Sequence, residues 1–249
     1  MKPMNPIRAI IPAAGKGTRL HCTDMPKAMY RVGGKPLLEI VLEQTDFIKK
    51  EDTYLVVGYQ KEKIIDYFGG PYHYVVQNEQ LGTGHAVMVC ADQFRDFSGT
   101  VLVTFGDMPL FRKEMMKKMC EQHEKNGAAC TLLTAENPAL DDWAKIIRDD
   151  GGRFRAIVEG RDCVGEQKNI QELFAGVLVF DSQALFATLP KITTNNVQKE
   201  YYLTEVPELM SQEGLLVETF MTDDPDDLRG INRPEDVPFC EAVLKKRGM

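Results

Sequence analysis

Short apolar runs alternate with longer amphipathic segments through the first half of the chain. The apolar runs predict buried strands at Ile7–Pro12, Thr53–Gly58, Tyr72–Gln77, Thr100–Phe105 and Ala128–Ala135. The segments between them carry apolar residues at helical spacing and predict helices at Pro36–Ile48, Lys61–Phe68, Thr83–Phe94 and Arg112–Lys125. Strands that alternate with helices indicate an α/β fold with a mostly parallel sheet covered by helices on both faces.

The pattern changes in the second half of the chain. Ala144–Arg148 and Phe154–Val158 flank a stretch rich in aspartate and glycine, which predicts a β-hairpin. Leu173–Phe180 predicts another buried strand, and Tyr202–Met210 and Pro234–Arg247 predict helices. No repeat, low-complexity tract or linker divides the sequence, so we expect one domain with a small antiparallel lobe in this half.

Composition narrows the class of protein. The chain has 249 residues, is 43% hydrophobic and 27% charged, and carries a formal net charge of −7, which argues against broad nucleic-acid binding. Its six cysteines form no C-x-x-C pair and indicate reduced thiols in a cytoplasmic protein. No segment has the pattern of a signal peptide or a membrane span, so we expect no membrane partner.

The first strand runs into a glycine turn, Ala13-Ala14-Gly15-Lys16-Gly17-Thr18-Arg19-Leu20. Glycines let the backbone approach an anion closely, and successive N–H groups of such a turn form a concave nest. Arg19 and the nearby Lys27 add positive charge. The spacing does not fit a P-loop, and Leu20 replaces the third glycine of a dinucleotide fingerprint. The turn therefore favours an oligophosphate site of another kind, although a plain strand-to-helix turn with two solvated charges is the alternative.

Asp107 follows the apolar strand that ends at Phe105, in a turn closed by Pro109. The carboxyl ends of parallel strands are where ligands bind in such sheets. A carboxylate at that edge suits Mg²⁺, which takes one or two protein oxygens together with phosphate. The alternative, which the spacing supports equally well, is an aspartate that caps its own turn.

The segment from Gln77 to Ala86 combines a strand end, two glycines and a helix start. A nucleobase could lie against Gly82 while the Gln77 amide, which offers a donor and an acceptor, pairs with the edge of uracil or, once flipped, of cytosine. The alternative is that Thr83 is the N-cap of the following helix and the glycines only shape the loop.

Three further candidates lie in the second half. Asn232 could complete a metal site, but Asn232 with Glu235 also resembles a capping box, and spacing alone favours the cap. Glu159 follows a short apolar run and either binds sugar hydroxyls or faces solvent. The segment from Glu200 to Glu205 either lines a pocket or starts a helix. The histidines show no metal spacing, and no arrangement suited to a covalent intermediate is present.

Together these motifs resemble those of sugar-1-phosphate nucleotidylyltransferases, most closely the uridylyltransferase domain of bifunctional N-acetylglucosamine-1-phosphate uridylyltransferase/glucosamine-1-phosphate acetyltransferases. The matching segments are PAAGKGTRL with PK, QNEQLGTGHAV, GDMPL, IVEG, NNVQKEYYLTEV and GIN. The resemblance implies a Rossmann-like mixed, mostly parallel sheet of the nucleotide-diphospho-sugar transferase type. We expect a single domain over residues 1–249, with a nucleotide-binding part at about 1–135, a sugar-side lobe at about 136–222 and a C-terminal helix at about 233–247. Because the sequence ends at Met249, we expect no acetyltransferase domain.

The resemblance also implies a role for each motif. The residues expected to hold the nucleotide are Ala13, Ala14, Gly15, Gly17, Thr18, Gln77, Gly82 and Thr83. Arg19, Lys27 and Asp107 are expected to be catalytic, and Asp107 and Asn232 to bind Mg²⁺, which replaces the cap that spacing favoured for Asn232. The expected sugar contacts are Glu159, Phe174, Gly176 and Ala144.

Two departures from the family fall on the sugar side. Phe174-Ala175-Gly176 stands where the family has Asn-Thr-Gly, and Trp143-Ala144-Lys145 stands where it has Tyr-Gly-Arg. The nucleotide motifs are intact. The departures therefore leave the identity of the acceptor open, whereas the predicted type of reaction is unchanged.

The predicted function is Mg²⁺-dependent transfer of a nucleotidyl group from UTP, or another nucleoside triphosphate, to a sugar-1-phosphate. The products are pyrophosphate and a nucleotide sugar such as UDP-N-acetylglucosamine. One alternative keeps this chemistry with another acceptor, either a different sugar phosphate or a phosphocholine-like molecule. Another is a nucleotide-sensing module that binds without turnover. The sequence leaves the oligomeric state open.

Overall fold

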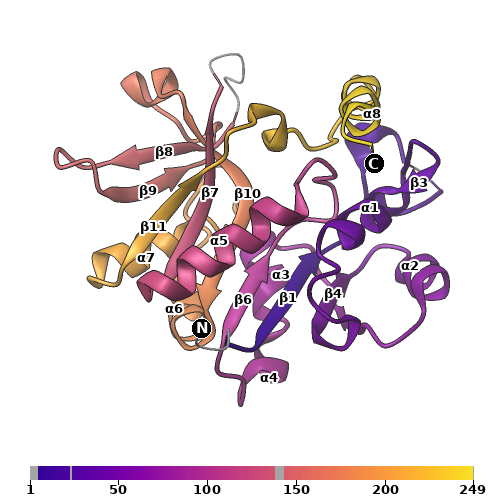
Figure 1. The fold of residues 1–249 in the computed structure, drawn as a ribbon, viewed down its shortest axis with the longest axis horizontal. Helices are drawn as coiled ribbons and strands as arrows, with labels where there is room; N and C mark the ends of the chain where they lie inside the picture. Colours follow the sequence, from indigo (N-terminus) through magenta and orange to yellow (C-terminus); the bar gives the residue numbers. More distant parts are fainter. Residues whose placement is uncertain (1–4, 23, 138–142, 249) are drawn as a thin grey trace.

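A nine-stranded mixed sheet forms the centre of the molecule in the computed structural model, which describes residues 5–22, 24–137 and 143–248 (Figure 1). Its main path runs β11-β7-β10-β6-β1-β4-β5. The pairs β6–β1, β1–β4, β4–β5 and β7–β11 are parallel, whereas β10 is antiparallel to both β6 and β7. The strands on this path are β1 (Ile7–Pro12), β4 (Thr53–Val57), β5 (His73–Val76), β6 (Thr100–Val103), β7 (Cys130–Glu136), β10 (Glu172–Asp181) and β11 (Val217–Met221).

Two smaller pieces of β-structure flank this path. A hairpin of β8 (Lys145–Arg148) and β9 (Phe154–Val158) joins the sheet at β10. A separate two-stranded sheet is made by β2 (Arg31–Val32) and β3 (Lys35–Pro36). In Figure 1 the hairpin extends from one side of the molecule, and β3 lies beside the C-terminal helix on the other.

The helices are short, apart from one that crosses a face of the sheet. They are α1 (Leu37–Gln44), α2 (Lys61–Phe68), α3 (Thr83–Met88), α4 (Ala91–Phe94), α5 (Lys113–Asn126), α6 (Ser182–Thr188), α7 (Glu205–Gln212) and α8 (Asp236–Lys246). Figure 1 shows α5 lying across the sheet and α8 beside α1. None of the helices in the described ranges has the length and apolar composition needed to cross a membrane.

Both faces of the sheet are buried, which explains why its strands read as continuous apolar runs. Successive side chains of a strand point to opposite faces. Ile10 and Val56 contribute to one apolar cluster, shared with buried residues of α3, α4, α6 and α7. Ala9, Ile11 and Leu55 contribute to the other, shared with residues of α1, α2 and α5. The predicted arrangement of helices on both faces is therefore confirmed.

Most predicted elements are confirmed with ends shifted by a few residues, and two differ more. The helix predicted over Thr83–Phe94 is divided into α3 and α4. The helix predicted from Tyr202 begins at Glu205, and the residues before it bond to another loop, where Tyr201 donates its backbone N–H to the Leu81 carbonyl. Helix α6, strand β11 and the short strands β2 and β3 were not predicted. The side chains of β11 are half-buried or exposed, as suits a strand at the sheet edge, so its sequence lacks an apolar run.

The antiparallel part predicted for the second half is present as the β8–β9 hairpin. It is continuous with the main sheet through β10, and β10 and β11 themselves belong to that sheet. Residues 138–142, within the lobe expected over 136–222, lie outside the described residues. The boundaries of that lobe therefore stay a prediction.

Candidate active site

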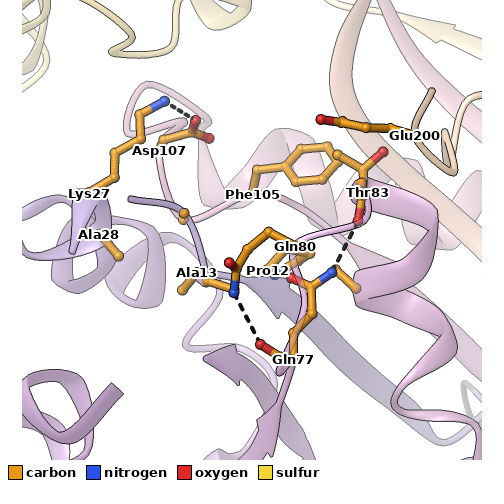
Figure 2. A pocket seen from close by; sticks show the side chains of 15 residues that line it. Pro12, Ala13, Lys27, Ala28, Gln77, Gln80, Thr83, Phe105, Asp107 and Glu200 are labelled. Atoms are coloured by element: carbon orange, nitrogen blue, oxygen red, sulfur yellow. Dashed lines mark hydrogen bonds and ion pairs between the residues drawn. The ribbon is translucent and has the colours of Figure 1, made fainter. Parts of the chain in front are cut away.

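The parallel strands β1, β4, β5 and β6 all end at one edge of the sheet, and a cleft of about 210 Å³ opens there. Backbone hydrogen bonds join the loops that follow the strands: Ala13 donates to Val56 and Gly106 donates to Pro12. The residues that line the cleft are Pro12, Ala13, Ala14, Gly15, Lys27, Ala28, Gln77, Gln80, Gly82, Thr83, Ala86, Phe105, Gly106, Asp107 and Glu200. In Figure 2 the Lys27–Asp107 pair lies at one end of the cleft and Gln77 at the other.

The first glycine turn forms a second, smaller cavity beside this cleft. Gly17 has a φ of +70°, and a Cβ there would lie 3.1 Å from the Cβ atoms of Cys22 and Lys27, so the turn needs glycine at this position. After it comes a single 3₁₀ turn, Thr18–Leu20, rather than the start of an α-helix. The cavity, of about 190 Å³, is lined by Gly17, Thr18, Arg19, Lys27 and Asn232. Lys27 is therefore shared by both cavities.

The Lys27 ammonium joins two residues that are far apart in the sequence. Its Nζ lies 2.5 Å from Asp107 Oδ2 and 2.7 Å from Asn232 Oδ1. The Lys27 side chain is 16% exposed and that of Asp107 is 28% exposed. A carboxylate oxygen and an amide oxygen thus converge on one cation, as the predicted metal pair requires. Arg19, in contrast, is exposed and has no hydrogen bond or ion pair with any described residue.

The loops that carry Asp107 and Asn232 are in direct contact. The Ile231 N–H donates to the Asp107 carbonyl over 2.9 Å. Gly230 packs so closely on Met108 that a Cβ would lie 2.4 Å from the Met108 sulfur. A Cβ there would also lie 3.1 Å from the Asp107 carbonyl oxygen, so the approach of the two loops leaves little room for a side chain.

The capping-box interpretation of Asn232 is wrong. The carboxylate of Asp236 accepts hydrogen bonds from the backbone N–H groups of Asn232 and Arg233, both over 2.8 Å. Helix α8 begins at Asp236, after Glu235 as N-cap, and Glu235 makes no capping hydrogen bond. The Asn232 side chain is thereby left to face Lys27.

The loop between β5 and α3 is held by a segment far along the chain. Gly82 has a φ of +112°, and a Cβ there would lie 2.5 Å from the Tyr201 carbonyl oxygen. Gly82 is also the N-cap of α3, so the interpretation of Thr83 as that cap is wrong. The Thr83 hydroxyl instead accepts the N–H of Leu203 over 3.0 Å. The glycines thus allow residues 201–203 to approach the cleft.

Gln77 is buried, and its amide nitrogen is used within the protein. It donates to the Gly82 carbonyl over 3.2 Å and lies 3.0 Å from His85 Nδ1. Its neighbour Gln80 donates to the Gln77 carbonyl over 3.2 Å (Figure 2). Gln77 therefore orders the Gly82 loop, and its pairing with a nucleobase stays a prediction.

Gln80 and Phe105 are lining residues that the sequence analysis did not single out. A Cβ at Gly58 would lie 2.8 Å from Gln80 Nε2, so a glycine after β4 makes room for this side chain. Their positions could have indicated this, since both follow a strand whose carboxyl end lies at the edge of the sheet where the cleft opens. The segment from Glu200 to Glu205 has both of its predicted roles, since Glu200 lines the cleft and helix α7 begins at Glu205.

The predicted sugar contacts do not line the cleft among the described residues. Glu159 accepts a hydrogen bond from the Thr204 hydroxyl over 3.0 Å, and burial raises the pKa of its carboxyl. Phe174 and Ala144 are buried neighbours, and the Phe174 N–H donates to the Ala144 carbonyl over 2.9 Å. Gly176, with a φ of +77°, lies in an irregular part of β10 against Met108. The role of these four residues stays a prediction.

Comparison with known proteins agrees with this architecture. The chain is 39% identical to the "Bifunctional protein GlmU" of Alkaliphilus metalliredigens over 241 residues, which cover 97% of this chain and 52% of that protein. It is also 39% identical to GlmU of Enterococcus faecalis over 239 residues, 96% of this chain and 52% of that protein. The chain thus spans about half the length of the curated relatives it matches.

The fold is shared with solved structures at lower identity. A UDP-glucose pyrophosphorylase complexed with UDP-glucose superposes with a TM-score of 0.74 at 18% identity, over 96% of this chain and 98% of that one. The predicted fold class is therefore confirmed. The sequence model of the MobA-like NTP transferase domain matches residues 9–198. This match covers most of the chain, and the protein therefore belongs to the family of MobA-like NTP transferase domains.

Proposed function

We propose that the protein transfers a nucleotidyl group from UTP to a sugar-1-phosphate, with release of pyrophosphate. The observation that carries the proposal is the convergence of Asp107 and Asn232 on Lys27, where the cleft and the glycine-turn cavity meet. In this assignment the base and ribose lie in the cleft, and the β- and γ-phosphates lie over the glycine turn near Arg19.

The site residues fit Mg²⁺. Asp107 and Asn232 offer one carboxylate and one amide oxygen, a hard donor set, and Mg²⁺ usually takes one or two protein oxygens while phosphates and water complete its coordination. Among the described residues no group of three or more histidine, cysteine, aspartate or glutamate side chains could hold a metal, so a cage built from such side chains is absent there. Bound at this pair, Mg²⁺ would neutralise negative charge on both phosphorylated substrates.

The chemistry needs positioning and charge more than acid–base catalysis. An oxygen of the sugar phosphate forms a bond to the α-phosphorus in line with the bond to the leaving pyrophosphate, which breaks. The attacking oxygen is already anionic at neutral pH, so no general base is needed, and no histidine is among the described lining residues. Lys27 offsets charge near the α-phosphate, and Arg19 stabilises the leaving group.

The test is pyrophosphate release from UTP, Mg²⁺ and N-acetylglucosamine-1-phosphate. We expect release to require all three components and to fall sharply in Asp107→Asn. Other nucleoside triphosphates in parallel report the selectivity for uracil. Nucleotide binding without release, whatever the acceptor, would overturn the assignment and favour a nucleotide-sensing module.

A different acceptor is the second candidate, and the residues at two family sugar positions favour it. Phe174 and Ala144 are both buried apolar residues, where the family has an asparagine and a glycine. Phe105 adds an aromatic wall to the cleft itself. A panel of N-acetylglucosamine-1-phosphate, glucose-1-phosphate and phosphocholine, each at equal concentration with UTP, separates the candidates by the ratio of kcat/KM values.

A further inference from the structure

A cluster of charged side chains around one buried aspartate lies outside the cleft, next to the loops that carry Asp107 and Asn232. At its centre the Asp227 side chain is fully buried. Nε of Arg112 lies 3.2 Å from both Asp227 carboxylate oxygens, and Nη2 of Arg112 lies 2.8 Å from Oδ2. Nη2 of Arg247 lies 3.0 Å from Oδ1 on the other side. We refer to Arg112, Asp227 and Arg247 as the arginine–aspartate cluster.

The surroundings of the cluster satisfy its remaining groups. The Thr222 hydroxyl donates to Asp227 Oδ2 over 2.5 Å. Asp223 and Asp224 provide a second carboxylate for each arginine, at 2.5 Å from Arg112 Nη2 and 2.6 Å from Arg247 Nη2. A buried charge is tolerated only with partners of this kind, since taking it out of water is costly.

The cluster is joined to both loops of the proposed metal pair. Arg112 follows the loop that begins at Asp107, and the Arg247 guanidinium also donates to the carbonyl of Leu110 in that loop. Asp227 lies in the 3₁₀ turn Pro225–Leu228, just before the loop that ends at Asn232. Arg247 is the C-cap of α8, the helix that follows Asn232. The three charged residues therefore connect both loops to one another without lining either cavity.

Apolar contacts already fix α8 to the rest of the molecule. Val243 and Leu244 of α8 pack in an apolar cluster with Leu110 and Ile231. A buried ion pair adds little stability compared with apolar side chains of the same size, but it defines the relative position of its parts through directional hydrogen bonds. The arginine–aspartate cluster is thus better suited to setting the distance between the two loops than to holding α8 in place.

We propose that Arg112, Asp227 and Arg247 are positioning residues that fix the separation of the Asp107 carboxylate and the Asn232 amide and so determine the affinity of this pair for Mg²⁺. The inference rests on the proposed function, because it takes the two residues as metal ligands. In other metal sites, loss of groups bonded directly to the ligands weakens metal binding by about 10- to 100-fold, and a cluster that acts through the two loops is expected at the lower end of that range.

The test measures metal binding directly as well as activity. Mn²⁺ is titrated into wild-type protein and Arg247→Met in the presence of non-cleavable α,β-methylene-UTP, with free Mn²⁺ followed by electron paramagnetic resonance. We expect the Mn²⁺ dissociation constant to rise about tenfold or more in Arg247→Met. The affinity for the analogue in the absence of metal should not change. In pyrophosphate-release assays the loss of rate at low Mg²⁺ should be recovered at saturating Mg²⁺, which a general loss of structure would not allow.

Arg148→Met is the matched control, because Arg148 makes a comparable two-contact ion pair with Glu172, at 2.6 and 2.7 Å, between β8 and β10. Its Mn²⁺ dissociation constant should equal that of wild type. If Arg247→Met does not fold, Thr222→Val removes one hydroxyl from the cluster at similar volume and should weaken Mn²⁺ binding in the same direction.

The outcomes separate the two proposals. Wild-type protein that binds neither Mn²⁺ nor the analogue would overturn the proposed function. If wild-type protein binds Mn²⁺ and the cluster variants bind it equally well, only the positioning role is overturned. Equal weakening in Arg148→Met would also overturn that role, since loss of any ion pair would then suffice.

Discussion

Replacing Lys27 with methionine should affect metal binding and turnover in opposite directions. The Lys27 ammonium donates to Asp107 over 2.5 Å and to Asn232 over 2.7 Å, so it occupies the position on which both proposed metal ligands converge. A hydrogen bond to a charged group contributes about 1.5–3 kcal/mol, and the partial exposure of this pair favours the lower end. A metal ion that displaces the ammonium loses about that amount. Lys27→Met should therefore bind Mn²⁺ about tenfold more tightly in the absence of nucleotide.

The same substitution should slow the reaction. Loss of one electrostatic contact to the transition state typically lowers kcat by about 10²- to 10³-fold. Mn²⁺ binding to the free protein is measured by electron paramagnetic resonance, and turnover by pyrophosphate release at saturating UTP and Mg²⁺. Lys27→Arg keeps the positive charge and should bind Mn²⁺ like wild type. Mn²⁺ affinity that is unchanged or lower in Lys27→Met would refute the idea that the ammonium competes with a metal for this pair.

Three other predictions concern the site and the fold. Asp107→Ala should abolish Mg²⁺-dependent pyrophosphate release while its circular dichroism spectrum stays that of wild type; near-normal release would exclude Asp107 as a metal ligand. Gly82→Ala places a Cβ 2.5 Å from the Tyr201 carbonyl at a φ of +112°, so urea titration should show a loss of about 1–3 kcal/mol in unfolding free energy, and an unchanged midpoint would contradict the contact. Burial lowers the pKa of His123 to about 4. The neutral His123 side chain therefore contributes fully to the free energy of unfolding above pH ~6.5, and this contribution is lost as the pH falls toward 4. The loss reaches up to about 3 kcal/mol. His123→Gln should remove that part of the pH dependence in urea titrations, and an identical pH profile would assign it elsewhere.

The parallel core and the ligand edge of the sheet could be predicted from sequence because both depend on local pattern. Strands buried on both faces read as continuous apolar runs, and the polar residues after them necessarily meet at one edge. Asp107 and Gln77 each stand at the end of such a run, and both line the cleft.

The contacts that complete the site could not be predicted from spacing, because their partners are distant in the chain. Asn232 with Glu235 has the spacing of a capping box, but Asp236 takes the backbone N–H groups and the Asn232 side chain faces Lys27. Gly82 is required by the Tyr201 backbone, which no local pattern reveals. The resemblance to a known family predicted a metal-binding role for Asn232, and the structure explains why its side chain is available.

A chain with a net charge of −7 can bind two phosphorylated substrates if positive charge is concentrated at one point. Lys27 does not supply that charge alone, because the Asp107 carboxylate beside it largely neutralises it. Arg19 is the cation of the glycine-turn cavity that has no partner among the described residues. Under the proposed function the side chains are therefore short of positive charge for a triphosphate and a sugar phosphate together, and a divalent cation would supply the difference without more basic residues. Asp107 is paired with Lys27 in this structure, and under the proposed function the same carboxylate would also hold the metal. A metal held there would leave the Lys27 ammonium available to a substrate phosphate.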